Sequence, residues 1–154
     1  MLQHGPSVVH AVRNAPELAL AGYGFLVNLG WEFAQTPLYA DVNGRPGYLL
    51  WTRLHCTLGD VIILCAAFWM TSLIWWKRSW WKAPQPGTVL TFVGIGLAYT
   101  IFSEWYNTTV LGSWAYAPRM PLILGIGLSP LLQWIVIPPL VLRLIRMRRA
   151  GTDQ

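Results

Sequence analysis

Long apolar segments alternate with short polar ones along the whole chain. Four apolar segments stand out, at about residues 16–35, 55–76, 88–106 and 121–145. Each holds about the 20 residues that a helix needs to cross roughly 30 Å of hydrocarbon. No ten-residue segment alternates between apolar and polar positions as a membrane-spanning strand would. The pattern predicts an all-α protein, a bundle of four transmembrane helices that forms one domain over residues 1–154.

The composition supports a membrane protein. Hydrophobic residues make up 55% of the chain and charged residues only 11%, whereas a soluble domain carries about 25% charged residues. This composition excludes a disordered chain and argues against a soluble enzyme. The net charge of +5 raises nucleic-acid binding as an alternative. We expect no nucleic-acid partner, because the basic residues flank apolar segments, as they do in membrane proteins.

The basic residues also predict an orientation. With four spans, both termini lie on one side of the membrane. That side carries eight Lys and Arg residues: Arg13, Lys77, Arg78, Lys82, Arg143, Arg146, Arg148 and Arg149. The other side carries three: Arg45, Arg53 and Arg119. Because Lys and Arg concentrate on the cytoplasmic side, we expect an integral protein of the bacterial inner membrane with both termini in the cytoplasm.

Two local features of the second span follow from its position and from helical geometry. Residues 47–54, just before it, are expected to form a short interfacial helix at headgroup depth. Cys56 and Cys65 lie nine residues apart on this span. They therefore occupy opposite helical faces, about 13 Å apart along the axis. We expect both thiols to stay reduced, because they cannot pair with each other.

Polar side chains inside the predicted spans gather at one end of the bundle. In the first span, Asn28, Glu32 and Gln35 follow at spacings of four and three, so they share one helical face. His55 and Asp60 lie near the start of the second span. With both termini inside the cell, all of these except Asn28 lie in the outer third of the membrane.

The three acids are expected to form one site. Glu104 lies near the end of the third span, with Asn107 three residues further on. At about 1.5 Å per residue, Glu32, Asp60 and Glu104 lie within roughly one helical turn of the same depth. Since lipid-facing carboxylates are costly, we predict that the three face one cavity within about 10 Å of each other. Arg53 and His55 are the expected cationic partners.

This set of residues suggests acid–base chemistry, with Glu32, Asp60, Glu104 and His55 as the candidate catalytic residues. One carboxylic acid would donate a proton to an alkene or epoxide, and a neighbouring carboxylate would accept one. Aromatic faces would stabilise a cationic intermediate. The side chains expected to contact the substrate are Asn28, Trp31, Gln35, Trp105, Asn107, Trp114, Tyr116, Gln133 and Trp134.

Other interpretations of the same acids stay open. An imidazole and three carboxylates would suit a metal ion, although we expect neither a metal nor another cofactor. The acids would also suit a proton path, or structural pairing with Arg53 or His55. Burying a carboxylate costs at least about 2.5 kcal/mol, which favours function for the set as a whole.

The segment Asn28-Leu29-Gly30-Trp31-Glu32 resembles the first-helix motif of the small integral-membrane terpene cyclases of fungal meroterpenoid pathways. The resemblance implies that Glu32 takes part in protonating a polyprene epoxide. Four helices with intramembrane acids and a His also look like the sterol isomerases of the emopamil-binding-protein family. The stretch from Glu104 to Gln133 looks loosely like part of the membrane carotenoid hydratases.

Two functions from different classes follow. The first is a membrane enzyme that isomerises or cyclises a lipid-soluble isoprenoid in an outward-facing pocket. The alternative is a non-catalytic accessory subunit, or a lipid- or quinone-binding component of a larger membrane complex. The expected partners are the lipid bilayer and a lipid-soluble small molecule, with a membrane-protein partner or a second copy of the chain as a further candidate.

Overall fold

The computed structural model of the protein describes residues 15–40 and 46–150, and the chain is mostly helical. Arg13 and Arg45, both counted in the predicted orientation, lie outside the described residues. The described elements follow in the order α2 (Pro16–Gln35), η1 (Thr36–Leu38), α3 (Pro46–Ile74), η2 (Trp80–Lys82), α4 (Pro86–Trp105), η3 (Tyr106–Leu111), β1 (Leu122–Ile123), β2 (Ile126–Gly127) and α5 (Leu128–Ala150).

Three helices are long and apolar enough to cross a membrane within the described part of the chain. They cover Gly47–Ile74, Pro86–Leu111 and Leu128–Ala150. The helix α2 is 20 residues long, but its buried face carries Asn28, Glu32 and Gln35. The all-α class is confirmed, and three helices of this length and composition fit a membrane protein.

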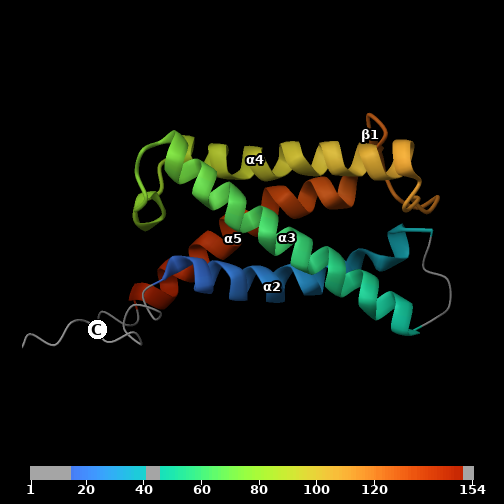
Figure 1. Cartoon of the computed structure of the whole chain (residues 1–154), viewed down its shortest axis with the longest axis horizontal. Coiled ribbons are helices and arrows are strands. Elements are labelled where there is room, and N and C mark those ends of the chain that lie inside the picture. The colour runs from blue at the N-terminus through green and yellow to red at the C-terminus, as the bar shows by residue number, and fades with distance from the viewer. Residues whose placement is uncertain (1–14, 41–45, 151–154) are drawn as a thin grey trace, which may run out of the picture.

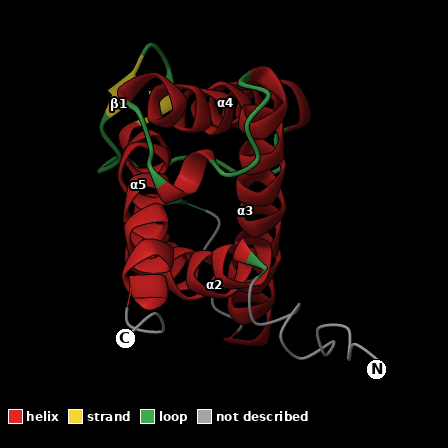
Figure 2. Ribbon diagram, turned by 90° about the vertical axis from the view of Figure 1, so that its left-hand side faces the viewer, coloured by secondary structure: helices red, strands yellow, loops and turns green. Residues whose placement is uncertain are grey.

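The four long helices form a frame around a common centre. Helices α2 and α4 lie on opposite sides, while α3 and α5 cross between them on the two remaining sides (Figures 1 and 2). Each helix packs against two neighbours, since α2 and α4 each contact both α3 and α5. The bundle has two distinct ends. We call the end where α2 and α4 finish and α3 and α5 begin the cavity end, and the opposite end the core end.

Each helix buries one narrow stripe of residues. On α4 the buried residues recur at every fourth position: Thr88, Phe92, Gly96, Thr100 and Glu104. On α2 a similar stripe is formed by Leu20, Gly24, Asn28 and Glu32. Stripes with a four-residue repeat pack as ridges into grooves at an inclined angle, which fits the diagonal crossing in Figure 1. On α2 the stripe passes from the apolar Leu20 toward the core end to the polar Asn28 and Glu32 toward the cavity end.

An apolar cluster fills the core end. Phe68 of α3, Trp80 of η2 and Phe92 of α4 pack with ring centroids 5.3–6.4 Å apart, within the range that aromatic pairs prefer. The Nε1–H of Trp80 donates to Ser72 Oγ at 3.1 Å, so its one polar group is satisfied. The core end is therefore closely packed, and the polar cavity lies at the opposite end of the bundle.

Two span boundaries differ from the sequence prediction. Helix α3 starts at Pro46, so residues 47–54 continue the second span instead of forming a separate interfacial helix. The fourth helix starts at Leu128, because residues 122–127 form a two-stranded hairpin with Ile123 opposite Ile126. Gly125 at its turn has φ +83°, a conformation that glycine adopts without a side-chain penalty. Because the residues of this hairpin are mostly apolar, the sequence predicted them as part of the fourth span.

Both cysteines are free, as their spacing predicted.

Candidate active site

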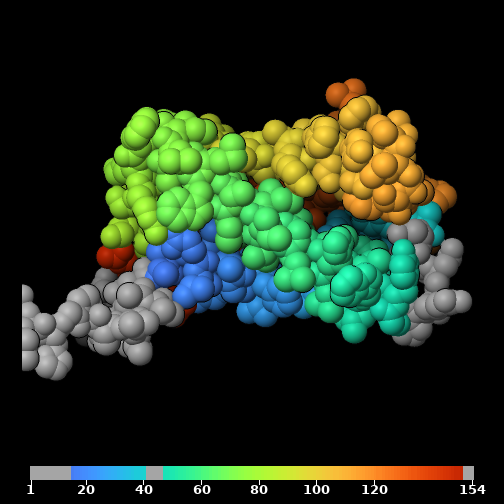
Figure 3. Space-filling view, in the orientation of Figure 1, coloured from blue at the N-terminus to red at the C-terminus, as the bar shows by residue number. Residues whose placement is uncertain are grey.

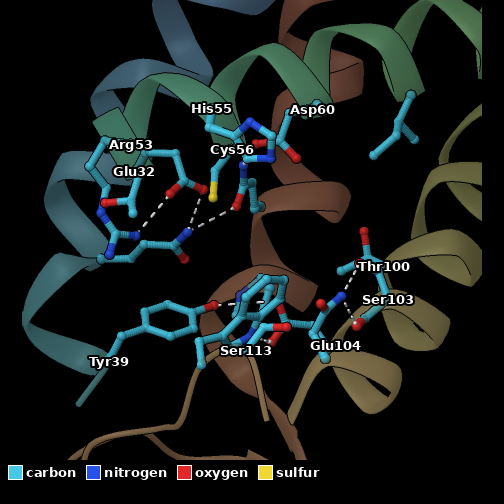
Figure 4. A pocket seen from close by; sticks show the side chains of 18 of the residues that line it. Glu32, Tyr39, Arg53, His55, Cys56, Asp60, Thr100, Ser103, Glu104 and Ser113 are labelled. Carbon is cyan, nitrogen blue, oxygen red and sulfur yellow. Dashed lines mark hydrogen bonds and ion pairs between the residues drawn. The ribbon is translucent and has the colours of Figure 1, made fainter. Parts of the chain in front are cut away.

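A cavity of about 390 Å³ lies at the cavity end, between all four long helices (Figure 4). The three acids Glu32, Asp60 and Glu104 all line it. They come from α2, α3 and α4 respectively. The predicted convergence of the three acids on one cavity is therefore confirmed.

Glu32 forms a buried ion pair with Arg53. The Nη1 of Arg53 lies 3.1 Å from Glu32 Oε2, and both side chains are almost fully buried. Gln35, one helical turn further along α2, donates from Nε2 to the other carboxylate oxygen, Oε1, at 2.7 Å. Each oxygen of Glu32 thus has its own donor, which a buried carboxylate needs in order to stay charged.

A chain of amides connects this ion pair to the second acid. Gln133 of α5 donates from Nε2 to Asp60 Oδ2 at 2.8 Å and to Asn28 Oδ1 at 2.9 Å. Its Oε1 accepts from Gln35 Nε2 at 3.4 Å. The connection Glu32–Gln35–Gln133–Asp60 therefore crosses from α2 through α5 to α3. Figure 4 shows it on the side of the cavity opposite Glu104.

Glu104 has a different set of partners, all neutral. Its carboxylate accepts hydrogen bonds from Tyr116 Oη at 2.5 Å, Trp114 Nε1 at 3.4 Å and Tyr39 Oη at 3.5 Å. Burial and the neighbouring carboxylates of Glu104 and Glu32 raise the pKa of Tyr39. Burial and the hydrogen bond to Glu104 raise the pKa of Tyr116. Both phenols therefore keep their protons and remain donors to Glu104.

A short backbone pairing holds these phenols in place. The segment after α2 and the loop after η3 form one antiparallel bridge, Tyr39 to Tyr116. Two hydrogen bonds flank it, from Ala40 N to Ala115 O at 2.8 Å and from Ala117 N to Leu38 O at 2.9 Å. Tyr39 also lies beneath the guanidinium of Arg53, 5.6 Å from its ring centroid. Tyr39 therefore contacts the partners of two acids at once.

Nine of the thirteen predicted site residues line the cavity. They are Glu32, Asp60, Glu104, His55, Gln35, Asn107, Trp114, Gln133 and Trp134. His55 lies at an exposed position on α3 beside Trp51, with ring centroids 6.1 Å apart. Of the two expected cationic partners, Arg53 is the one that pairs with an acid.

Four predicted contact residues lie elsewhere. Trp105 was placed wrongly, since it is 48% exposed and packs against Phe102. It follows Glu104 directly, so it points about 100° away around the helix. Trp31 packs against the apolar core. Asn28 is buried and accepts a hydrogen bond from Gln133, and Tyr116 lies outside the lining but contacts two lining residues, Glu104 and Tyr39.

Some cavity residues were not predicted. Tyr39, Tyr48, Tyr99 and Cys56 line the cavity, but none of them was among the residues that the sequence predicted at the site. A continuous helix through residues 47–54 would have placed Arg53 seven residues before Asp60, on the same face. This position agrees with the role of cationic partner that the sequence predicted for Arg53. Nothing in the sequence indicated that Tyr39, far from Tyr116 along the chain, pairs with it.

The metal alternative finds no support in the part of the chain that is described. No group of three or more His, Cys, Asp and Glu side chains among those residues is arranged to hold a metal ion. Two of the three acids already have their oxygens engaged by protein donors.

No protein-family model matches the chain, and no curated protein or solved structure matches it either.

Proposed function

We propose that the protein is a membrane-embedded enzyme that isomerises or cyclises a lipid-soluble isoprenoid by proton transfer in this cavity. The observation that carries the proposal is the unequal partnering of three acids around one cavity. Glu32 has a guanidinium, Glu104 has three donors, and Asp60 has the amide of Gln133. Carboxyl groups in unequal environments are how enzymes separate a proton donor from a proton acceptor.

The proposal includes four membrane crossings, with α2 as the fourth. The polar residues of α2 face the bundle, whereas Leu18, Leu26 and Phe33 on its other faces are exposed. A helix with polar groups buried inward and apolar groups outward suits contact with lipid. Its 20 residues span about 30 Å.

Asp60 is the proposed proton donor. Its described hydrogen bond is to a neutral amide, while Glu32 is compensated by a full positive charge. A carboxylate without a cationic partner is expensive in an apolar surrounding, so Asp60 is the acid best suited to hold a proton. Glu104 is the proposed acceptor, because three protein donors stabilise its negative charge.

The chemistry balances with these two acids. The O–H bond of Asp60 breaks and its proton adds to a substrate double bond, which leaves a carbocation and a negative charge on Asp60. For isomerisation, an adjacent C–H bond breaks, its proton goes to Glu104, and its electron pair forms the new double bond. For cyclisation, a second double bond first attacks the cation and forms a C–C bond. Solvent then carries the proton from Glu104 back to Asp60.

The aromatic residues fit the same scheme. Trp114 and Trp134 line the cavity, and a carbocation beside an indole face is stabilised electrostatically. In this proposal Glu32 and Arg53 are positioning residues. They hold Gln35 and thereby Gln133, the donor to Asp60.

Deuterium uptake tests the proposal whichever product the enzyme forms. Membranes containing the protein would be incubated in D₂O with squalene, geranylgeraniol and the membranes' own isoprenoids, and the lipids analysed by mass spectrometry. We expect deuterium at carbon in at least one isoprenoid. Asp60→Asn and Glu104→Gln should each reduce the uptake by about 100-fold or more, the usual contribution of acid–base catalysis.

The matched control is Glu17→Gln. Glu17 is an acid at the core end, paired with Arg78 at 2.6 Å and distant from the cavity. This variant should keep full uptake. Uptake that is unchanged in Asp60→Asn and Glu104→Gln, or no uptake in any of the isoprenoids, would contradict the proposal.

The alternative of an accessory subunit is favoured by one separate feature, the hairpin β1–β2. Leu122, Ile123 and Leu124 are all exposed there, Leu124 to 99%. Figure 3 shows the hairpin projecting from the rest of the surface at the cavity end. A partner protein retained at fixed stoichiometry through purification, and lost in Leu124→Asp, would favour this alternative over the enzyme.

A further inference from the structure

The cavity is closed on two sides and open on a third. Its lining residues on α2 and α5 are all buried: Glu32, Gln35, Pro130, Gln133 and Trp134. Its exposed lining residues lie on α3, on α4 and in the loop after η3: Tyr48, Trp51, His55, Tyr99 and Ser113. The mouth therefore lies between α3 and α4. Figure 3 shows the surface hollowed there, with α5 visible behind.

The mouth opens sideways from two helices that have the length and composition of membrane spans. A gap between two such helices faces the surrounding lipid. The 29 residues of α3 extend about 43 Å, longer than the hydrocarbon layer, so one end of α3 lies at headgroup depth. Tyr48 and Trp51 near its start are 52% and 65% exposed, as is usual for aromatic residues at the membrane interface.

We propose that the cavity takes the uncharged polar end of a single-chain lipid directly from the bilayer, through this mouth, while the tail stays in the lipid. The inference rests on the proposed function and names the substrate class of the same site. The polar end of such a lipid already lies at headgroup depth, so it would need to move only sideways in the membrane to enter the cavity. The cavity's volume of about 390 Å³ is at the small end of the range for ligand pockets, so it holds one end of a long isoprenoid.

The charges around the cavity select the polar end. Three carboxyl groups line it, and the proposed function leaves Glu32 and Glu104 charged. The one guanidinium among the described lining residues is that of Arg53, which already pairs with Glu32. A phosphate or carboxylate end would add a further negative charge to a poorly hydrated site, which is strongly unfavourable. Arg53 also has a buried Nε–H without a hydrogen-bond partner. An uncharged hydroxyl, epoxide or carbonyl oxygen would accept a hydrogen bond from such a group.

The test compares lipids that differ only in the end group. The purified protein in lipid nanodiscs would be incubated with tritiated geranylgeraniol or geranylgeranyl phosphate, and the bound lipid counted. We expect geranylgeraniol to bind at least about tenfold more tightly than the phosphate, a difference of about 1.4 kcal/mol. Equal or tighter binding of the phosphate would overturn the choice of an uncharged end.

A glycine pair tests the mouth. Gly59 on α3 lines the cavity, and a side chain added there would meet open space. Gly94 on α4 also faces open space but lies outside the cavity lining. Gly59→Trp should weaken geranylgeraniol binding by about tenfold or more, while Gly94→Trp should change it by less than about twofold. Equal binding in the two variants would overturn the lateral mouth.

This experiment separates the inference from the proposed function. Asp60→Asn, which should be inactive in deuterium uptake, should still bind geranylgeraniol. If that variant binds the alcohol and keeps full deuterium uptake, the proton-transfer proposal fails while the lateral mouth survives. If the native protein takes up deuterium but Gly59→Trp binds geranylgeraniol as tightly as the native protein does, the lateral mouth is contradicted and the proton-transfer proposal is not.

Discussion

At the scale of single residues, the ion pair between Glu32 and Arg53 changes what a substitution at Glu32 would mean. The resemblance to terpene cyclases implies that Glu32 protonates the substrate. In the structure both oxygens of Glu32 are held by Arg53 and Gln35. Loss of activity in Glu32→Gln would therefore not distinguish a proton donor from half of a structural ion pair.

A double substitution makes that distinction. Removing one partner of a buried ion pair costs about 3–5 kcal/mol, because the other charge is left uncompensated. We expect Glu32→Gln and Arg53→Met each to lower the free energy of unfolding by such an amount. The double variant should recover most of it. The measurement is unfolding of the purified protein by increasing denaturing detergent, followed by circular dichroism. Additive losses in the double variant would contradict the ion pair.

At Leu124 the backbone conformation and the exposure of the side chain are both unfavourable. Its φ of 51° lies in the left-handed region, and its side chain is 99% exposed. Such a conformation costs roughly 1–2 kcal/mol for a residue with a Cβ atom. Glycine avoids this cost, but it loses more conformational entropy on folding, which offsets part of the gain. Leu124→Gly should therefore raise the free energy of unfolding in detergent by about 1 kcal/mol or less. Leu124→Ala, which keeps the strain, is the control. A lower stability of Leu124→Gly would reveal a stabilising contact of the leucine side chain.

At the scale of elements, small residues determine how closely the helices approach. Two glycines of α4, Gly94 and Gly96, differ in what surrounds them. A Cβ atom on Gly96 would lie 2.0 Å from Cε3 of Trp134, whereas a Cβ atom on Gly94 would meet nothing within 4 Å. The indole of Trp134, which lines the cavity, rests on Gly96.

These two glycines therefore predict opposite effects of the same substitution. Gly96→Ala should lower the free energy of unfolding by about 1–3 kcal/mol, the usual cost of overpacking. Gly94→Ala should leave it unchanged or raise it by up to about 1 kcal/mol, because alanine favours helix. Thermal unfolding of both variants in one detergent measures the difference. Equal stabilities would show that Trp134 moves away without cost.

The sequence predicted the helices better than the segments between them. A Pro at the first position of α2 and α4 and long apolar runs mark helices whatever surrounds them. The hairpin at 122–127 and the start of α3 depend on contacts with other segments. The sequence also made no prediction about the backbone of the third helix beyond Glu104. Its backbone changes to a π-helix at Tyr106–Leu111, with Asn107 bonded back to Ser103 O at 2.9 Å.

At the scale of the whole molecule, the common depth of the three acids was enough to predict one cavity. Once the direction of each span is known, so is the end of each helix that lies at the same end of the bundle. The same argument could not reveal which partner each acid has. Those partners come from Gln133 on α5 and from Tyr39 and Tyr116 in connecting segments. The positions of Tyr39 and Tyr116 follow from the bridge between two segments that are distant in the sequence, which no local pattern encodes.

The structure also revises the charge count behind the predicted orientation. Arg53 lies inside α3 and is buried against Glu32, so it is not a loop charge. The predicted outer side is left with Arg45 and Arg119, against eight basic residues on the predicted cytoplasmic side. The asymmetry that orients membrane proteins is counted over loops near the span ends. The correction therefore strengthens the expectation that the core end faces the cytoplasm.

Cysteine labelling at the two ends tests this orientation. Cys56→Ala and Cys65→Ala would first remove both native thiols, which should leave folding intact because neither forms a disulfide. Ser113 is exposed at the cavity end and Ser79 at the core end, beside Arg78. In intact cells, a membrane-impermeant maleimide should label Ser113→Cys and leave Ser79→Cys unlabelled until the membrane is opened, because the predicted orientation places the core end in the cytoplasm. The reverse pattern would place the cavity end in the cytoplasm, and the mouth between α3 and α4 would then draw its lipid from the inner leaflet.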